Sequence, residues 1–195
     1  MKLEKKLKTD PGNPANRYRL ARALHLEGVN GDDDATERAL DILEELAVEE
    51  PRNPQVLAYL GSAKLLAAKR AFFPWSKNSL TDEGIVLIDQ AVALAPDNLE
   101  IRFVRGISSY PLPTSFNRHK SACADFDVVA GRAEEAVLAD KMDANLAAKT
   151  FYYHGLCLEE NGRKKEARAS WEKAAAIAPG SSFALLAGEK ISNMD

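Results

Sequence analysis

The chain has 195 residues, of which 46% are hydrophobic and 28% are charged, a composition typical of a soluble folded protein. It carries 26 basic and 29 acidic side chains, a net charge of −3, so it lacks the strongly basic field that nucleic-acid binding requires. No run approaches the roughly 20 apolar residues that span a bilayer, so we expect no membrane insertion.

The first ten residues, MKLEKKLKTD, are rich in lysine, and because no apolar run follows them we expect no secretory signal. Leu3 and Leu7 are four residues apart and could pack a short helical turn onto the body. Two cysteines, Cys123 and Cys157, are too few to define a disulfide framework. Together with the missing signal they favour a reducing, cytoplasmic setting.

The first predicted helix pair begins at NPANRYRLARALHLEG, where Leu20, Ala21 and Leu24 lie on the face that contacts a neighbour. Its second helix ends in ALDILEELAVEEP, with Leu43 and Leu46 on the apolar stripe. The acidic run DDD between them has no calcium-loop spacing and is expected to cap the second helix.

The second and third predicted pairs share a spacing, in which a small residue follows a proline by ten positions. Pro51 leads to Gly61 in one first helix, and Pro96 leads to Gly106 in the next. Each pair has a long link between its two helices, FFPWSKNS in the second pair and PLPTSFNRH in the third.

The last predicted pair, KTFYYHGLCLEENGRKKEARASWEKAAAIAPGS, has the most regular pattern. Gly155 and Ala167 are small, as required where two antiparallel helices approach closely, and Trp171 fills the space beside that contact. Gly162 suits the positive φ of a helix end. Pro179 ends the second helix because it cannot donate the next backbone hydrogen bond.

This pattern resembles the tetratricopeptide repeat (TPR) family, whose unit is a 34-residue helix–turn–helix. The resemblance covers almost the whole chain and is tightest in the last pair, where His154 replaces the usual leucine before the glycine. It implies an all-α, right-handed helical-repeat solenoid of about four helix pairs. We predict one domain over residues 1–195, with repeats at about 14–53, 54–98, 99–142 and 148–181 and a capping helix at 182–193.

In a solenoid of this kind the first helix of each pair lines a concave groove that holds a peptide or a partner helix. The groove candidates are Tyr18, Arg22, His25, Ser62, Leu65, Phe103, Ile107, Tyr110, Tyr152, Leu156 and Glu159. Each could instead pack against a neighbouring helix. The Asn positions of the TPR carboxylate clamp hold Ser62, Ile107 and Leu156, so chaperone-tail binding is not expected. The mixed aromatic and aliphatic groove favours an apolar partner segment.

The two long links occupy equivalent places in adjacent repeats, and two interpretations of their aromatic residues remain open. Phe72, Phe73 and Trp75 could be buried against Leu112 and Phe116, as a staple between the links. They could instead form an exposed docking patch. The candidates for that patch are Phe72, Phe73, Trp75, Phe116 and Arg118.

No phosphate-binding glycine loop, nucleophile elbow or paired-histidine zinc helix occurs in the sequence, so we expect no enzyme and no cofactor. His119 and Cys123 are four residues apart, and His154 and Cys157 are three apart, so a two-Cys, two-His zinc site could form if their helices met. Ordinary helix packing explains the same residues. We therefore predict no metal site.

The sequence thus predicts a non-catalytic interaction module, a scaffold or adaptor that binds a protein or peptide in its groove, and self-association is compatible with this role. The alternative is a small-ligand-binding or catalytic helical-repeat protein with a pocket near the long links. An open groove would favour the first, and an enclosed pocket with converging ionisable groups the second.

Overall fold

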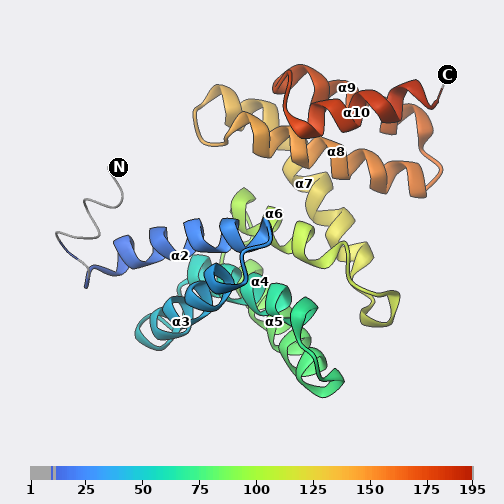
Figure 1. The fold of residues 1–195 in the computed structure, drawn as a ribbon. Helices are drawn as coiled ribbons and strands as arrows, with labels where there is room; N and C mark the ends of the chain where they lie inside the picture. Colours follow the sequence, from blue (N-terminus) through green and yellow to red (C-terminus); the bar gives the residue numbers. More distant parts are fainter. Residues whose placement is uncertain (1–9, 11, 195) are drawn as a thin grey trace. The chain divides into compact units, whose positions relative to one another are not determined.

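The computed structural model describes residue 10 and residues 12–194. Across this part of the chain the secondary structure is α-helical with one short 3-10 helix and no strand, as predicted (Figure 1). The expectation for Leu3 and Leu7 lies outside the described residues. No helix among the described residues is both long enough and apolar enough to cross a membrane.

The helices follow one another in pairs. The pairs are α2 (Pro14–Val29) with α3 (Asp33–Glu49), α4 (Pro54–Arg70) with α5 (Pro74–Leu94), α6 (Leu99–Ser109) with α7 (His119–Leu138), and α8 (Ala144–Glu160) with α9 (Lys164–Ile177). A final helix, α10 (Ser182–Ser192), packs against α8 and α9. The predicted all-α helical-repeat architecture with a capping helix is confirmed for the described residues, while the packing of α6 on α7, which lie in different compact units, stays a prediction.

Polar caps and prolines set where these helices begin. Asn13, Asn53 and Asp143 each accept hydrogen bonds from backbone N–H groups of the first turn, which have no partner inside the helix. Asp32 caps α3 in this way, as its acidic run predicted, and Ser181 caps α10. Helices α2, α4 and α5 begin at a proline, whose missing N–H costs nothing at that position.

The chain divides into two compact units, Met1–Ser108 and Ser109–Asp195. The core of the first unit is formed by apolar residues of α2 to α6, including Leu43, Leu46, Val56, Ile88 and Ile101. In the second unit the largest fully buried side chains are Trp171, Phe126 and Phe151. The interpretation of residues 1–195 as a single domain stays a prediction.

Close helix contacts in both units occur at the predicted glycines. A Cβ atom at Gly61 would lie 2.6 Å from the carbonyl oxygen of Gly84, so α4 and α5 touch backbone to backbone. A Cβ atom at Gly155 would lie 2.2 Å from Nε1 of Trp171, whose indole covers the glycine. The register predicted for the last pair therefore places its tryptophan correctly.

Candidate functional site

Side chains from three successive first helices meet on one surface of the first unit. Helix α2 contributes Tyr18, Arg22 and His25, α4 contributes Tyr59 and Ser62, and α6 contributes Glu100. We call these six residues the Arg22 face. Because each first helix supplies at least one member, the surface follows from how the repeats stack.

An ion pair lies at the centre of the Arg22 face. The Arg22 guanidinium lies 2.5 Å from Oε1 of Glu100, and the Tyr59 hydroxyl donates to the same oxygen at 2.8 Å. Arg22 also stacks over the ring of Tyr59, 5.0 Å from its centroid. Burial, and then the nearby Glu100 carboxylate, raises the pKa of Tyr59, so its hydroxyl stays protonated and remains a donor.

His25, Ser62 and Ser108 extend this network along α2, α4 and α6. Nε2 of His25 lies 2.9 Å from Oγ of Ser62, which in turn lies 2.9 Å from Oγ of Ser108. The rings of Tyr18 and His25 both meet Tyr59 edge-on. The Tyr18 hydroxyl is buried and has no hydrogen-bond partner among the described residues.

The structure changes the chemistry predicted for this surface. Leu65 and Phe103 are 4% and 6% exposed, so they belong to the core and a partner cannot reach them. Ile107 is half-buried. Apart from Ile107, what remains is aromatic and polar. Leu65 and Phe103 are wrong as groove-lining residues because these first-helix positions pack against the neighbouring helices, and an apolar partner segment stays a prediction.

Sequence reasoning missed Tyr59, Glu100 and Ser108. Tyr59 lies three residues before Ser62 on α4, a spacing that places both on one face of a helix, so this residue could have been found. Glu100 is in the first turn of α6, where an acidic residue is ordinarily explained by the helix dipole. Only the packing of α2, α4 and α6 shows that it meets Arg22.

The predicted first-helix residues of the second unit lie in different contacts. Tyr152 packs against Tyr153 and Phe183, and Glu159 accepts an ion pair from Lys190 of α10 at 2.6 Å. Leu156 is half-buried. The structure therefore places Tyr152 and Glu159 against the capping helix, where α10 covers part of the predicted surface.

The aromatic residues at the junction of α4 and α5 are exposed. Phe72 is 90%, Trp75 69% and Phe73 50% exposed, and the rings pack on one another, with Phe73 and Trp75 stacked at 4.5 Å. The expectation of a buried staple is wrong, and so is the expectation of a long link at FFPWSKNS. Helix α5 begins at Pro74, so Phe72 and Phe73 lie on a short turn and Trp75 lies in the first turn of α5. We call Phe72, Phe73 and Trp75 the aromatic turn.

The other two residues predicted for the docking patch lie in the α6–α7 link. Phe116 ends the 3-10 helix Thr114–Phe116 and is half-buried. Arg118 precedes α7, and its carbonyl oxygen accepts a hydrogen bond from Ser121. Asn117 between them adopts a left-handed conformation, with φ of 51°, which turns the chain into α7.

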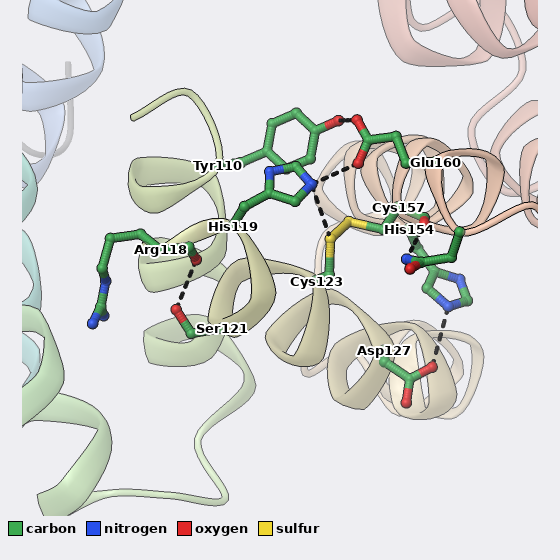
Figure 2. Close-up of a disulfide and its surroundings, with 10 residues drawn as sticks. Tyr110, Arg118, His119, Ser121, Cys123, Asp127, His154, Cys157 and Glu160 are labelled. Atoms are coloured by element: carbon green, nitrogen blue, oxygen red, sulfur yellow. Dashed lines mark hydrogen bonds and ion pairs between the residues drawn. A yellow bond between two sulfur atoms is a disulfide. The ribbon is translucent and has the colours of Figure 1, made fainter. Parts of the chain in front are cut away.

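A disulfide joins Cys123 of α7 to Cys157 of α8 (Figure 2). Two cysteines were too few for the sequence to predict this bond, and their number carries no signal that would have paired them. Disulfides are rare in reducing compartments, and the cytoplasmic setting expected from the sequence stays a prediction.

Polar side chains surround the disulfide on one side. Nε2 of His119 lies 3.6 Å from Sγ of Cys123 and 2.5 Å from Oε2 of Glu160. The Tyr110 hydroxyl donates to the other Glu160 oxygen at 2.7 Å. Tyr110, which was a groove candidate, therefore helps to hold this cluster.

His154 turns away from the disulfide. Its Nε2 lies 3.3 Å from the Asp127 carboxylate (Figure 2). Its Nδ1 lies 3.0 Å from Oγ of Ser170. Burial lowers the pKa of His154, and Asp127 opposes that shift. The four-residue set of two cysteines and two histidines considered from the sequence is thus not what the fold brings together.

An open groove of about 620 Å³ lies between α3, α4 and α5 of the first unit. Its apolar lining includes Leu60, Val86 and Leu87. Lys64 donates to Glu44 at 2.8 Å and to Glu83 at 3.0 Å across it. Asp82 adds a third carboxylate to the lining, so the charged groups of the groove are one lysine, which is already paired, and three acidic residues.

Comparison with solved structures identifies the fold. The chain is similar to the crystal structure of TTC0263, a thermophilic TPR protein in Thermus thermophilus, with a TM-score of 0.70. The match covers 97% of this chain and 87% of that one at 19% sequence identity. The chain has the TPR fold.

A second TPR-like match is the crystal structure of MamA, with a TM-score of 0.52 and 18% identity over 98% of this chain and 87% of that one. No family model matches the sequence, and no curated protein matches it. At these identities the comparisons establish the TPR architecture, and the role of each surface has to be argued from the residues themselves.

Proposed function

We propose that this TPR-fold chain is a non-catalytic interaction module that binds a protein segment along the first helices of its first unit. The observation that carries the proposal is the Arg22 face, where α2, α4 and α6 each supply side chains to one hydrogen-bonded and stacked network. The first helices of TPR solenoids are the elements that line partner grooves.

The chemistry of the Arg22 face favours a polar peptide over an apolar helix. Arg22 keeps 43% of its side chain exposed while paired to Glu100, so its remaining guanidinium N–H groups can donate to a partner's carbonyl or carboxylate oxygens. The Tyr18 and Tyr59 rings provide flat, rigid contact area beside that donor.

The test uses the intact chain and a partner recovered with it from its source organism. Arg22→Ala should weaken binding of the purified partner by about 2 kcal/mol, the loss typical of a central Arg anchor. Arg19→Ala is the matched control, because Arg19 is an exposed arginine on the same helix. Equal affinity for the parent and Arg22→Ala would contradict the proposal.

The aromatic turn is a second candidate surface, because three adjacent exposed rings are unusual on a soluble protein. Trp75→Ala should leave the free energy of unfolding within about 0.5 kcal/mol of the parent, as for an exposed residue. If Trp75→Ala abolishes partner binding while Arg22→Ala does not, the binding site is the aromatic turn.

The small-ligand alternative has less support. The groove between α3, α4 and α5 is open and its Lys64 is already paired with Glu44 and Glu83. Its lining residues belong to the bodies of these helices, whereas the alternative predicted from the sequence was a pocket near the long links.

A further inference from the structure

Four side chains of the second unit that are able to ligate a metal lie within reach of one another. They are His119 and Cys123 of α7 with Cys157 and Glu160 of α8, and their ligand atoms all lie within 4.8 Å of each other. The spacings, four residues on α7 and three on α8, place each pair on one face of its helix. Figure 2 shows both faces turned toward the disulfide.

We propose that the reduced protein binds one Zn²⁺ through Cys123, Cys157, His119 and Glu160, and that the disulfide is the metal-free, oxidised state of the same site. Two thiolates, one imidazole and one carboxylate make a four-ligand set that suits zinc. Thiolate ligands select against Mg²⁺ and Ca²⁺, which prefer oxygen.

The distances are close to those that a tetrahedral site requires. With zinc–ligand bonds of about 2.0–2.3 Å, ligand atoms of a tetrahedron lie roughly 3.3–3.8 Å apart. Nε2 of His119 already lies 3.6 Å from Sγ of Cys123. Its 2.5 Å distance to Glu160 would lengthen once the metal replaced the shared proton. The two Cα atoms of the cysteines, 5.6 Å apart, can remain in place while the sulfurs rotate apart.

Neighbouring groups support the ligands. The Tyr110 hydroxyl donates to Oε1 of Glu160 at 2.7 Å and leaves Oε2 directed at His119. The Tyr110 ring also lies 4.7 Å from the His119 ring. Outer contacts of this kind orient ligands in metal sites. His119 and Glu160 are 45% and 46% exposed, whereas Cys157 is 3% exposed, so the ion has a route in from solvent.

Interconversion of the two states balances in electrons and protons. A dithiol reductant transfers two electrons and two protons to the disulfide, giving two thiols and the cyclic disulfide of the reductant. Zn²⁺ then binds both sulfurs as thiolates and two protons leave. In the other direction a low-molecular-weight disulfide takes two electrons from the thiolates, the protein S–S bond forms, Zn²⁺ is released and the oxidant leaves as two thiolates.

The experiment titrates the intact chain with Zn²⁺ against a chromophoric chelator, before and after reduction and anaerobic removal of the reductant. We expect one equivalent bound to the reduced protein and none to the oxidised protein. Co²⁺ in place of Zn²⁺ should give the intense visible bands of tetrahedral cobalt and a thiolate-to-cobalt charge-transfer band. Bound Zn²⁺ should also slow oxidation of the thiols by a small-molecule disulfide.

Three variants distinguish this site from nonspecific binding by thiols. His119→Gln and Glu160→Gln should each weaken binding by the reduced protein at least tenfold, and both residues are exposed enough to be replaced without unfolding. His154→Gln is the matched control, because His154 is on the same helix as Cys157 but faces Asp127 and Ser170. Circular dichroism checks that each variant is folded.

The proposal is overturned if the reduced protein binds no Zn²⁺, or if His119→Gln and Glu160→Gln bind it as tightly as the parent. It is equally overturned if His154→Gln loses as much affinity as His119→Gln, or if the oxidised protein binds the metal as well as the reduced one. This site lies in the second unit, so its failure would leave the proposed role of the Arg22 face untouched.

Discussion

The two units solve the same packing problem, the close approach of paired helices, in different ways. In the first unit α4 meets α5 where Gly61 and Gly84 face each other, and a Cβ atom on either would strike the carbonyl oxygen of the other. In the second unit α8 meets α9 where Trp171 covers Gly155, and the Trp171 indole donates to the carbonyl oxygen of Tyr152 at 3.0 Å.

The structural role of a small residue in a repeat therefore depends on the residue that packs against it. Opposite another glycine it allows two backbones to touch, and the contact cannot adjust because a backbone cannot rotate away. Opposite a tryptophan it forms the floor of a side-chain pocket, and the contact can be relieved by changing the side chain. The second unit also has a covalent link, Cys123–Cys157, between α7 and α8.

Breaking that covalent link is expected to have the largest effect. Reduction should lower the free energy of unfolding by about 3–4 kcal/mol, because a cross-link between residues 34 apart restricts the unfolded chain. Urea denaturation of the oxidised and reduced protein, both in a metal chelator, measures this. The control is Cys123→Ser, whose denaturation midpoint should be the same with and without the reductant. An unchanged midpoint on reduction of the parent would show that the link contributes nothing.

Gly61→Ala should come next, with a loss of about 3 kcal/mol, since the added methyl lies 2.6 Å from both the Gly84 carbonyl oxygen and the Ile88 side chain. Gly131→Ala on α7 is the control, because a Cβ atom there meets nothing within 4 Å of it among the described residues. It should raise stability by up to about 1 kcal/mol. Thermal melts that rank the two variants equally would refute the backbone contact between α4 and α5.

Gly155→Ala should cost about 2 kcal/mol, because the methyl displaces the fully buried Trp171 indole. The informative measurement is a double-mutant cycle. Trp171→Leu should offset part of the Gly155→Ala cost, with a coupling of about 1 kcal/mol. The parallel cycle of Gly61→Ala with Ile88→Ala should show less coupling, because the Gly84 carbonyl remains. Equal coupling energies in the two cycles would show that the glycine contacts of the two units do not differ in their ability to adjust.

The smallest expected effect is a pH dependence at His154. Because burial lowers its pKa below the ordinary value near 6.5, the unfolded chain binds the proton more readily than the folded one. The free energy of unfolding therefore has its full His154 contribution above pH 6.5. That contribution is lost as the pH drops from there toward the lower pKa of the folded state. In the His154→Gln variant the denaturation midpoint should depend less on pH across this window. A variant with the slope of the parent would assign the pH dependence to other groups.

The aromatic links show where sequence reasoning stopped. PLPTSFNRH and FFPWSKNS were both predicted to be long links, but the second prediction is wrong, because α5 begins at Pro74 and includes residues 74–79. Clustered aromatic residues are usually buried. Burial depends on what the turn leaves beside the rings, and here Pro74 begins α5 directly after Phe73. The Arg22 face shows the same limit in another form, since Tyr18, Arg22, His25 and Ser62 could be chosen by their helix positions but their partner Glu100 could not.

The helix pairs could be predicted from local sequence, because proline, glycine and capping residues act within one or two turns and apolar periodicity sets the buried face of each helix. The regular spacing of the repeat also predicted that Gly61 and Gly155 lie at close helix contacts, although it did not show that Gly61 meets Gly84. Tertiary packing was needed to show that Leu65 and Phe103 are core residues, that Cys123 meets Cys157, and that Glu160 rather than His154 joins them. These outcomes depend on the rotation of neighbouring helices about their axes, which is set by the summed packing of many side chains and leaves no mark in local spacing.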